Sequence, residues 1–507
     1  MVADPSTDRD QPASTANSRR PLLARFAIPI GFVAVALVSL LLTSRRGLQG
    51  DEHHYHKISV VMAESLVSAA QGLPVDWSLV LDGVISRGWS LPGMGVVLAP
   101  AHLVFGGEAP LLAVRIHALL VNLALIALIV RELRKLGLSR TLAGTSMLAC
   151  CVLPYYVAFL SKLWADCIGV HLALLFMLYC ERLLVTRRLS GGRAVGAGLL
   201  LFAASFVRPQ YILLAAIVAL RLVFDTIENR SLEAGRGRRS AAVVGTVLLV
   251  LLPMTIGLST WSSALDKRYG DVFLLTSTSL KPLFSSDDFA VSAMKSQKTN
   301  NKYHAVYQEV AERAALSRIT FTEQADRLVA ELPAKNFETL WTRKLRSLGA
   351  FYFWENSRLI KILGVRIKDL PEASLLARGL LFANSAAWMC ILMVGLLAFV
   401  CPARPSNGNY LLPLWLKGAA FLIMMQPLYA TTHGRYYVIL VPILMLLIFL
   451  TVRERVARGE ESRHPATRCG VWIAAGQAFA AVYGVALIAC LLYVLTVLLP
   501  SPIGLPR

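Results

Sequence analysis

The sequence predicts an all-α polytopic membrane protein with about eleven transmembrane helices. Of its 507 residues, 56% are hydrophobic and only 16% are charged, and the mean hydropathy is +0.58. Apolar runs of about 20 residues, the length that crosses a bilayer, recur along the chain. Lys and Arg gather in alternate connections between these runs. Together these observations exclude a disordered or an ordinary cytosolic protein.

The first apolar run, about 26–43, follows a polar segment, 1–25, that we expect to be a disordered cytoplasmic tail. Ser44-Arg45-Arg46 follows it, where a signal peptide would have a small-residue cleavage site, so we expect a retained anchor. The other expected spans lie at about 110–130, 141–160, 166–185, 194–207, 211–224, 241–260, 376–400, 411–430, 436–450 and 471–499.

The basic residues orient the spans. With a cytoplasmic N-terminus, the inner connections carry nearly all the clustered charge, as the positive-inside rule requires. These clusters are Arg131, Arg134, Lys135 and Arg140; Arg182, Arg187, Arg188 and Arg193; Arg230, Arg236, Arg238 and Arg239; and Arg453, Arg455, Arg458, Arg463 and Arg468. The net charge of +20 therefore reflects membrane orientation and contact with anionic lipids. Nucleic acid is not expected as a partner. The predicted location is the inner (plasma) membrane.

Two long segments lie outside in this topology. The first outer loop, 44–109, contains two apolar stretches, 58–72 and 92–106, that are broken by polar residues or by Gly and Pro. We expect both to be helices that lie in the membrane interface. The loop belongs to an N-terminal transmembrane catalytic module, 26–260.

The second long outer segment, 261–375, mixes charges of both signs. Its stretches 321–332 and 336–348 have apolar residues at helical spacing, which predicts a small helical cap on the outer face of the bundle. Residues 376–507 supply the C-terminal transmembrane helices.

An acidic, histidine-rich string, Gly50 to His56, follows the first span. Asp51 is a candidate general base, and Glu52 beside it is the second acid. An interfacial polar loop without a role is the competing interpretation. No metal site is expected, because the adjacent His53 and His54 point in different directions. Were a divalent metal bound, Asp51, His54 and His56 would be its ligands.

A third acid, Asp166, starts the span at 166–185, four residues after Lys162. It faces the same compartment as Asp51, which makes it a further catalytic candidate, although Asp is also a common helix N-cap. Lys162 is a candidate for binding an anion from the same turn.

Arginines at outer span ends are candidates for binding a lipid phosphate. Arg208 lies in an outer turn, Arg435 and Tyr436 open a late span, and Arg115 lies near the outer start of the second span. A guanidinium fork suits phosphate well. Each arginine alone could equally snorkel to lipid headgroups.

This set of motifs resembles the polytopic glycosyltransferases of the GT-C fold, in particular the protein O-mannosyltransferases and lipid A aminoarabinose transferases. The resemblance covers most of the chain. It rests on the acidic pair Asp51-Glu52 after the first span, the stretch from Pro92 to Gly106, Arg115, Asp166, Arg208-Pro209, and Arg435-Tyr436 with Pro442. One departure is Leu91-Pro92, where those proteins usually have Pro-Pro.

The resemblance implies a membrane glycosyltransferase that uses a polyprenyl-phosphate sugar and inverts the anomeric carbon on the periplasmic or extracellular face. Asp51 would deprotonate the acceptor hydroxyl, and Arg435, with Lys162 or Arg208, would stabilise the leaving lipid phosphate. The acceptor, a cell-envelope glycan, glycolipid or protein, stays open, as does metal dependence. Two alternatives are a transporter or flippase of an anionic lipid-linked substrate and a non-catalytic assembly subunit with the same fold.

Overall fold

The computed structural model describes a helical membrane protein. It covers residues 22–44, 46–77, 80–81, 84, 91–186, 190–217, 219, 236–269, 280, 282–284, 286–298, 302–332, 375–400, 412–424 and 437–458. Among these residues every regular element is a helix, in agreement with the predicted all-α class.

Five described helices are long and apolar enough to cross a membrane. They are α1 (Leu22–Ser44), α5 (Leu111–Lys135), α8 (Ala165–Val185), α11 (Arg236–Tyr269) and α18 (Leu375–Val400). Each overlaps an expected span, and the molecule is a multi-pass membrane protein.

A sixth expected span is bent rather than straight. It consists of α6 (Arg140–Cys151) and α7 (Pro154–Leu160), which meet at 93°. The break occurs at Leu153, whose ψ of 129° is extended. Proline at position 154 lacks an N–H and crowds the residue before it, so the helix cannot continue through this point. Hydropathy predicts one continuous span over 141–160, and the break at Leu153 shows that this prediction is wrong.

Shorter apolar helices account for part of the remaining spans. These are α9 (Gly191–Val207), α19 (Leu412–Met424) and α21 (Tyr437–Arg458), and the span expected at 211–224 opens as a 3-10 helix, η2 (Pro209–Leu213). The span expected over 471–499 lies outside the described residues.

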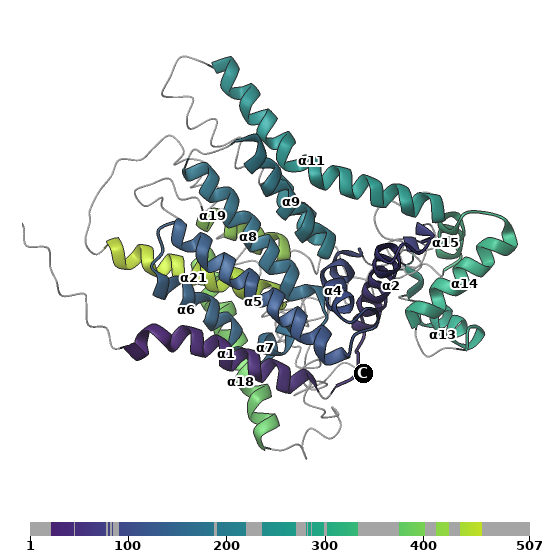
Figure 1. Ribbon diagram of the computed structural model, residues 1–507, viewed down its shortest axis with the longest axis horizontal. Coiled ribbons are helices and arrows are strands. Elements are labelled where there is room, and N and C mark those ends of the chain that lie inside the picture. Colours follow the sequence, from purple (N-terminus) through teal and green to yellow (C-terminus); the bar gives the residue numbers. More distant parts are fainter. Residues whose placement is uncertain are drawn as a thin grey trace, which may run out of the picture.

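Helix α8 forms the centre of the bundle (Figure 1). Its apolar window is 83% buried, against 17% for α1 and 22% for α11. It contacts α5, α7, α9, α19 and α21. Helices α1 and α11 lie at the periphery and leave apolar side chains such as Leu41 and Leu248 exposed, which suits contact with lipid tails.

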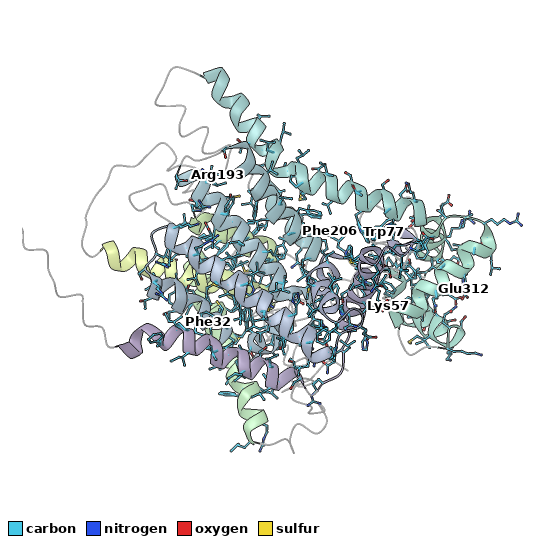
Figure 2. All side chains as sticks on the ribbon, viewed as in Figure 1. Phe32, Lys57, Trp77, Arg193, Phe206 and Glu312 are labelled. Carbon is cyan, nitrogen blue, oxygen red and sulfur yellow. The ribbon has the colours of Figure 1, made fainter. Side chains whose placement is uncertain are left out.

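The two helices expected in the first outer loop are present. They are α2 (Glu52–Ala70) and α4 (Gly93–Val104), and they pack on each other. Figure 2 shows Lys57 and Trp77 of this segment between the bundle and the helix that carries Glu312.

The second outer segment contains α13 (Asp287–Ser296), α14 (Lys302–Ser317) and α15 (Phe321–Ala330), which pack in sequence order at one end of the molecule (Figure 1). Helix α15 matches the expected helix at 321–332 and starts with a capping box formed by Thr320 and Glu323. The helix expected over 336–348 lies outside the described residues.

Candidate active site

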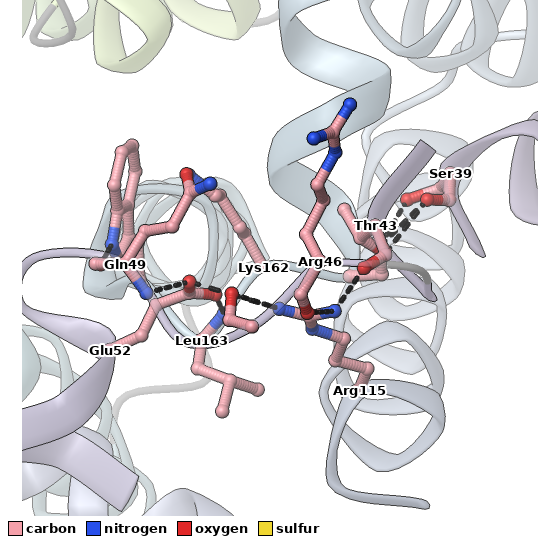
Figure 3. Close-up of polar contacts among 11 residues, drawn as sticks. Ser39, Thr43, Arg46, Gln49, Glu52, Arg115, Lys162 and Leu163 are labelled. Carbon is pink, nitrogen blue, oxygen red and sulfur yellow. Dashed lines mark hydrogen bonds and ion pairs between the residues drawn. The ribbon is translucent and has the colours of Figure 1, made fainter. Parts of the chain in front are cut away.

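The structure brings several of the predicted outer residues to one end of the bundle, which we call the outer end. Two chain segments meet there (Figure 3). The first is the acidic loop, residues 46–52, between α1 and α2. The second is the α7–α8 turn, residues 161–164.

Glu52 ties the acidic loop to the α7–α8 turn. Its Oε1 accepts a hydrogen bond from the backbone N–H of Leu163 at 3.0 Å. Its Oε2 accepts one from the N–H of Gln49 at 2.8 Å. The side chain is fully buried. Both carboxylate oxygens are therefore engaged with backbone donors, as suits an acid that holds the loop in place.

Arg115, near the start of α5, holds the end of α1. Its guanidinium donates to the carbonyls of Thr43, Arg46 and Gly47, the last two at 2.7 and 3.2 Å. Carbonyls at a helix C-terminus lack intrahelical partners, and a cation suits that end of the helix dipole. Arg115 Nη2 also lies 3.9 Å from Glu52 Oε2. This arginine therefore positions the acidic loop.

Lys162 lies in the α7–α8 turn, and its exposed fraction is only 2%. Its Nζ donates to Gln49 Oε1 at 3.1 Å and lies 3.6 Å from the centroid of the Trp164 ring, a cation–π distance. The indole Nε1 of Trp164 donates to the Gln49 carbonyl at 3.2 Å. The ammonium is thus placed directly beside the acidic loop.

Asp166, in the first turn of α8, forms a buried ion pair with Arg208, which follows α9. Gly169 lies on the same face of α8, and a Cβ built on it would be 3.0 Å from both Arg208 Cγ and Tyr211 Cε2. Glycine at this position leaves the space through which Arg208 reaches the carboxylate. Asp166 is not the N-cap of α8, because Trp164 occupies that position.

Asp51 differs from the other two acids in its exposure. Glu52 and Asp166 are buried, whereas Asp51 is half-buried at the N-terminus of α2. It is the N-cap residue, but its side chain makes no capping hydrogen bond. Of the three acids, Asp51 is therefore the one that an incoming molecule can reach.

Of the three histidines after Asp51, His53 is exposed, and His56 faces His102 in the contact between α2 and α4. His54 and His56 are buried, and the His56 and His102 rings meet edge to face at 5.0 Å. His102 Nδ1 accepts from the Ala109 N–H at 3.0 Å, so Nε2 carries the proton towards Ser59 Oγ, 3.0 Å away. Burial lowers the pKa of both His56 and His102, and Glu108 opposes that shift.

No three His, Cys, Asp or Glu side chains in the described part of the chain are arranged to hold a metal ion. The set considered as an alternative from the sequence, Asp51 with His54 and His56, does not form such a group. Arg435 and Tyr436 lie outside the described residues.

A second ionic cluster lies at the opposite end of the bundle. Buried Glu132 pairs there with Arg182 and with Lys135, the latter at 3.0 Å. These cations come from the inner connections of the predicted topology. The acidic loop and the basic inner connections therefore lie at opposite ends of α5.

Sequence reasoning missed several residues that build the outer end. Gln49 contacts both Lys162 and Trp164. Ser39, Thr43 and Ser161 join α1 to the α7–α8 turn through hydroxyl contacts of 2.7 and 2.8 Å. Polar residues inside apolar runs were the available signal, since such residues are costly in a membrane and need partners.

The sequence matches no family model and no curated protein. The structure is similar to the oligosaccharyltransferase AglB from Archaeoglobus fulgidus in complex with an inhibitory peptide and a dolichol-phosphate, at 13% identity and a TM-score of 0.37. The apo form of the same enzyme gives 12% and 0.40. Both matches cover 93% of this chain and 56% of the other, so this chain spans just over half the enzyme's length.

It is also similar to ArnT from Cupriavidus metallidurans in the apo state, at 15% identity and a TM-score of 0.32, over 87% of this chain and 82% of that one. TM-scores below 0.5 do not transfer residue roles from one protein to another. The roles of the residues at the outer end therefore rest on their own contacts.

Proposed function

We propose that the protein is a membrane glycosyltransferase of the GT-C type, which transfers a sugar from a polyprenyl-phosphate donor to an acceptor hydroxyl on the outer face. One observation carries the proposal: an accessible acid, Asp51, stands on a loop that a buried acid and two buried cations hold at one end of a membrane bundle. Ionisable groups so close to lipid are costly, and a functional role is their default explanation.

Asp51 is the general base in this proposal. The acceptor hydroxyl is a poor nucleophile until its proton is removed, and the base must lie within hydrogen-bond reach. Asp51 takes the proton while the acceptor oxygen attacks the anomeric carbon. The bond from that carbon to the phosphate oxygen breaks in the same inverting displacement.

The leaving lipid phosphate gains negative charge, which a nearby cation stabilises. Lys162, whose Nζ donates to the Gln49 side chain of the acidic loop, is the described candidate for this role, and Arg435 is the candidate from the late span. Arg208 stays with Asp166, and this pair fixes the start of α8 against the end of α9. Glu52 and Arg115 position the loop and do not touch the substrate in this proposal.

The test is sugar transfer by the purified full-length protein in detergent. Asp51→Asn keeps the size and polarity of the side chain but is no longer basic, so transfer should fall by about 100- to 10,000-fold while donor binding persists. A chelator should leave transfer unchanged.

Glu52→Gln is the matched control at the neighbouring acid. An amide cannot accept hydrogen bonds from two backbone N–H groups with both of its ends, so this variant should melt at a lower temperature and lose less activity than Asp51→Asn. Near-normal transfer by Asp51→Asn would refute the base assignment. Loss of transfer with chelator would instead indicate metal chemistry.

A further inference from the structure

A chain of buried hydrogen bonds links three helices near the outer end, and the reaction proposed above does not use it. The Tyr156 hydroxyl of α7 lies 2.7 Å from His171 Nε2 on α8. His171 Nδ1 lies 2.9 Å from Asn122 Oδ1 on α5. The exposed fraction of each residue is 1% or less. Polar groups at this depth are retained only where they are satisfied.

Donor and acceptor counting fixes the direction of this chain. Asn122 Nδ2 donates to the carbonyl of Leu160 at 2.8 Å and to that of Ala118 at 3.2 Å. Its Oδ1 must therefore accept, so His171 Nδ1 carries a proton. In a neutral imidazole Nε2 then accepts, and the Tyr156 hydroxyl donates to it. The network is complete with a neutral histidine.

The network ends on a helix that needs outside support. Helix α7 has only seven residues, and so short a helix is not stable by itself. Its first turn is held by Asn384 of α18, whose Oδ1 accepts from the Tyr155 N–H at 3.1 Å. Its last carbonyl, at Leu160, is held by Asn122. Two asparagines from other helices thus hold both ends of α7.

The residue after Leu160 begins the α7–α8 turn. That turn contains Lys162 and supplies the N–H of Leu163 to Glu52. Asn122 therefore fixes the point from which the Lys162 side chain reaches the acidic loop, and His171 fixes the orientation of the Asn122 amide.

We propose that His171, Tyr156 and Asn122 are positioning residues that set the place of the Lys162 ammonium, and that His171 acts by hydrogen bonding and carries no proton for the reaction. The effect on turnover rests on the proposed function, whereas the effect on the placement of Lys162 does not.

The first experiment measures how fast an amine-specific acylating reagent modifies Lys162 in the full-length protein in detergent, read by peptide mass spectrometry. His171→Leu removes the partner of Asn122 Oδ1 and the acceptor of the Tyr156 hydroxyl, so acylation should be about tenfold faster. His171→Gln keeps one donor and one acceptor and has no titratable ring, so acylation should stay near the unmodified rate. Ser146→Ala is the control, because Ser146 is buried but bonds only within its own helix.

Tyr156→Phe removes one hydroxyl without changing the size of the ring, and tests the network even if His171→Leu does not fold. It should accelerate acylation by about threefold. Unchanged acylation in a folded His171→Leu protein, or in Tyr156→Phe, would overturn the inference. So would His171→Gln if Lys162 reacted as fast as in His171→Leu.

The second experiment measures sugar transfer. His171→Leu should lower kcat by about 10- to 100-fold with little change in KM, because Lys162 acts on the leaving phosphate in the transition state. His171→Gln should restore most of kcat. Loss of kcat in His171→Gln equal to that in His171→Leu would indicate proton transfer by the ring. Absence of transfer in the unmodified protein would refute the proposed function alone, since the acylation result stands without it.

Discussion

His102 shows how its neighbours determine the chemistry of a single side chain. It is fully buried between α2 and α4, and its Nδ1 is already an acceptor for the Ala109 N–H. Protonation would place two N–H groups against each other in a site that excludes water. Burial disfavours the charged imidazole and lowers its pKa below the usual 6.5, and the nearby His56 lowers that pKa further.

The expected consequence is a loss of stability in mild acid. The unfolded chain binds a proton at His102 as the pH falls below 6.5, whereas the folded protein resists. The stabilisation is therefore complete above that pH and is lost as the pH falls towards the lower, folded pKa. Thermal unfolding in detergent between pH 8 and pH 5 should show a steeper fall in Tm for the unmodified protein than for His102→Gln. Parallel curves would contradict this assignment.

Among the helix contacts, the one between α4 and α9 requires a glycine at position 93. A Cβ on Gly93 would lie 2.5 Å from the carbonyl carbon and oxygen of Phe206 and 2.6 Å from the Val207 nitrogen. Backbone atoms cannot rotate away from such a contact. Arg208 follows directly, so helix α4 is packed against the chain that leads to the Asp166 ion pair.

Gly93→Ala should therefore force α4 and α9 apart and destabilise the protein by about 1–3 kcal/mol, the usual range for overpacking. The matched control is Gly107→Ala, in the loop after α4, where an added Cβ meets nothing within 4 Å. Thermal unfolding of both variants in the same detergent compares them. An equal Tm for Gly93→Ala and Gly107→Ala would show that the contact between α4 and α9 has room for a Cβ at position 93.

How far the sequence predicts such elements depends on whether their causes are local. Helices α2 and α4 follow from apolar patterns within each stretch, and α15 follows from its periodicity. The 93° break at Leu153 has a local signal in Pro154, yet hydropathy alone predicts one span across it. The bond from Leu163 to Glu52 joins residues 111 positions apart, and no local pattern reveals it. That the described acids lie at one end of the bundle with Arg115 and Arg208 was predictable, because alternate spans return to the same side.

At the scale of the whole molecule, the orientation is the next quantity to measure. The predicted topology places α13 outside and the start of α6 inside. In a background without native cysteines, Lys295→Cys should react with a membrane-impermeant thiol reagent in intact cells, and Thr141→Cys should react only after permeabilisation. Both positions are exposed, so burial does not confound the comparison. Equal labelling would reject the topology, and the reverse pattern would place the acidic loop in the cytoplasm.

The hydrogen bonds from Arg115 to the end of α1 also imply an order in which the partners of this segment are synthesised. Helix α1 emerges before α5, which brings the Arg115 donors for the Thr43 carbonyl, and the hydroxyl that meets Ser39 and Thr43 arrives later still, with Ser161. A nascent chain that ends before this serine carries the acidic loop and Arg115, but it lacks Lys162 and the Leu163 N–H, which bond to Gln49 and Glu52. The bond between Glu52 and Leu163 spans 111 positions, so the described partners of the acidic loop are complete only after the α7–α8 turn has been synthesised.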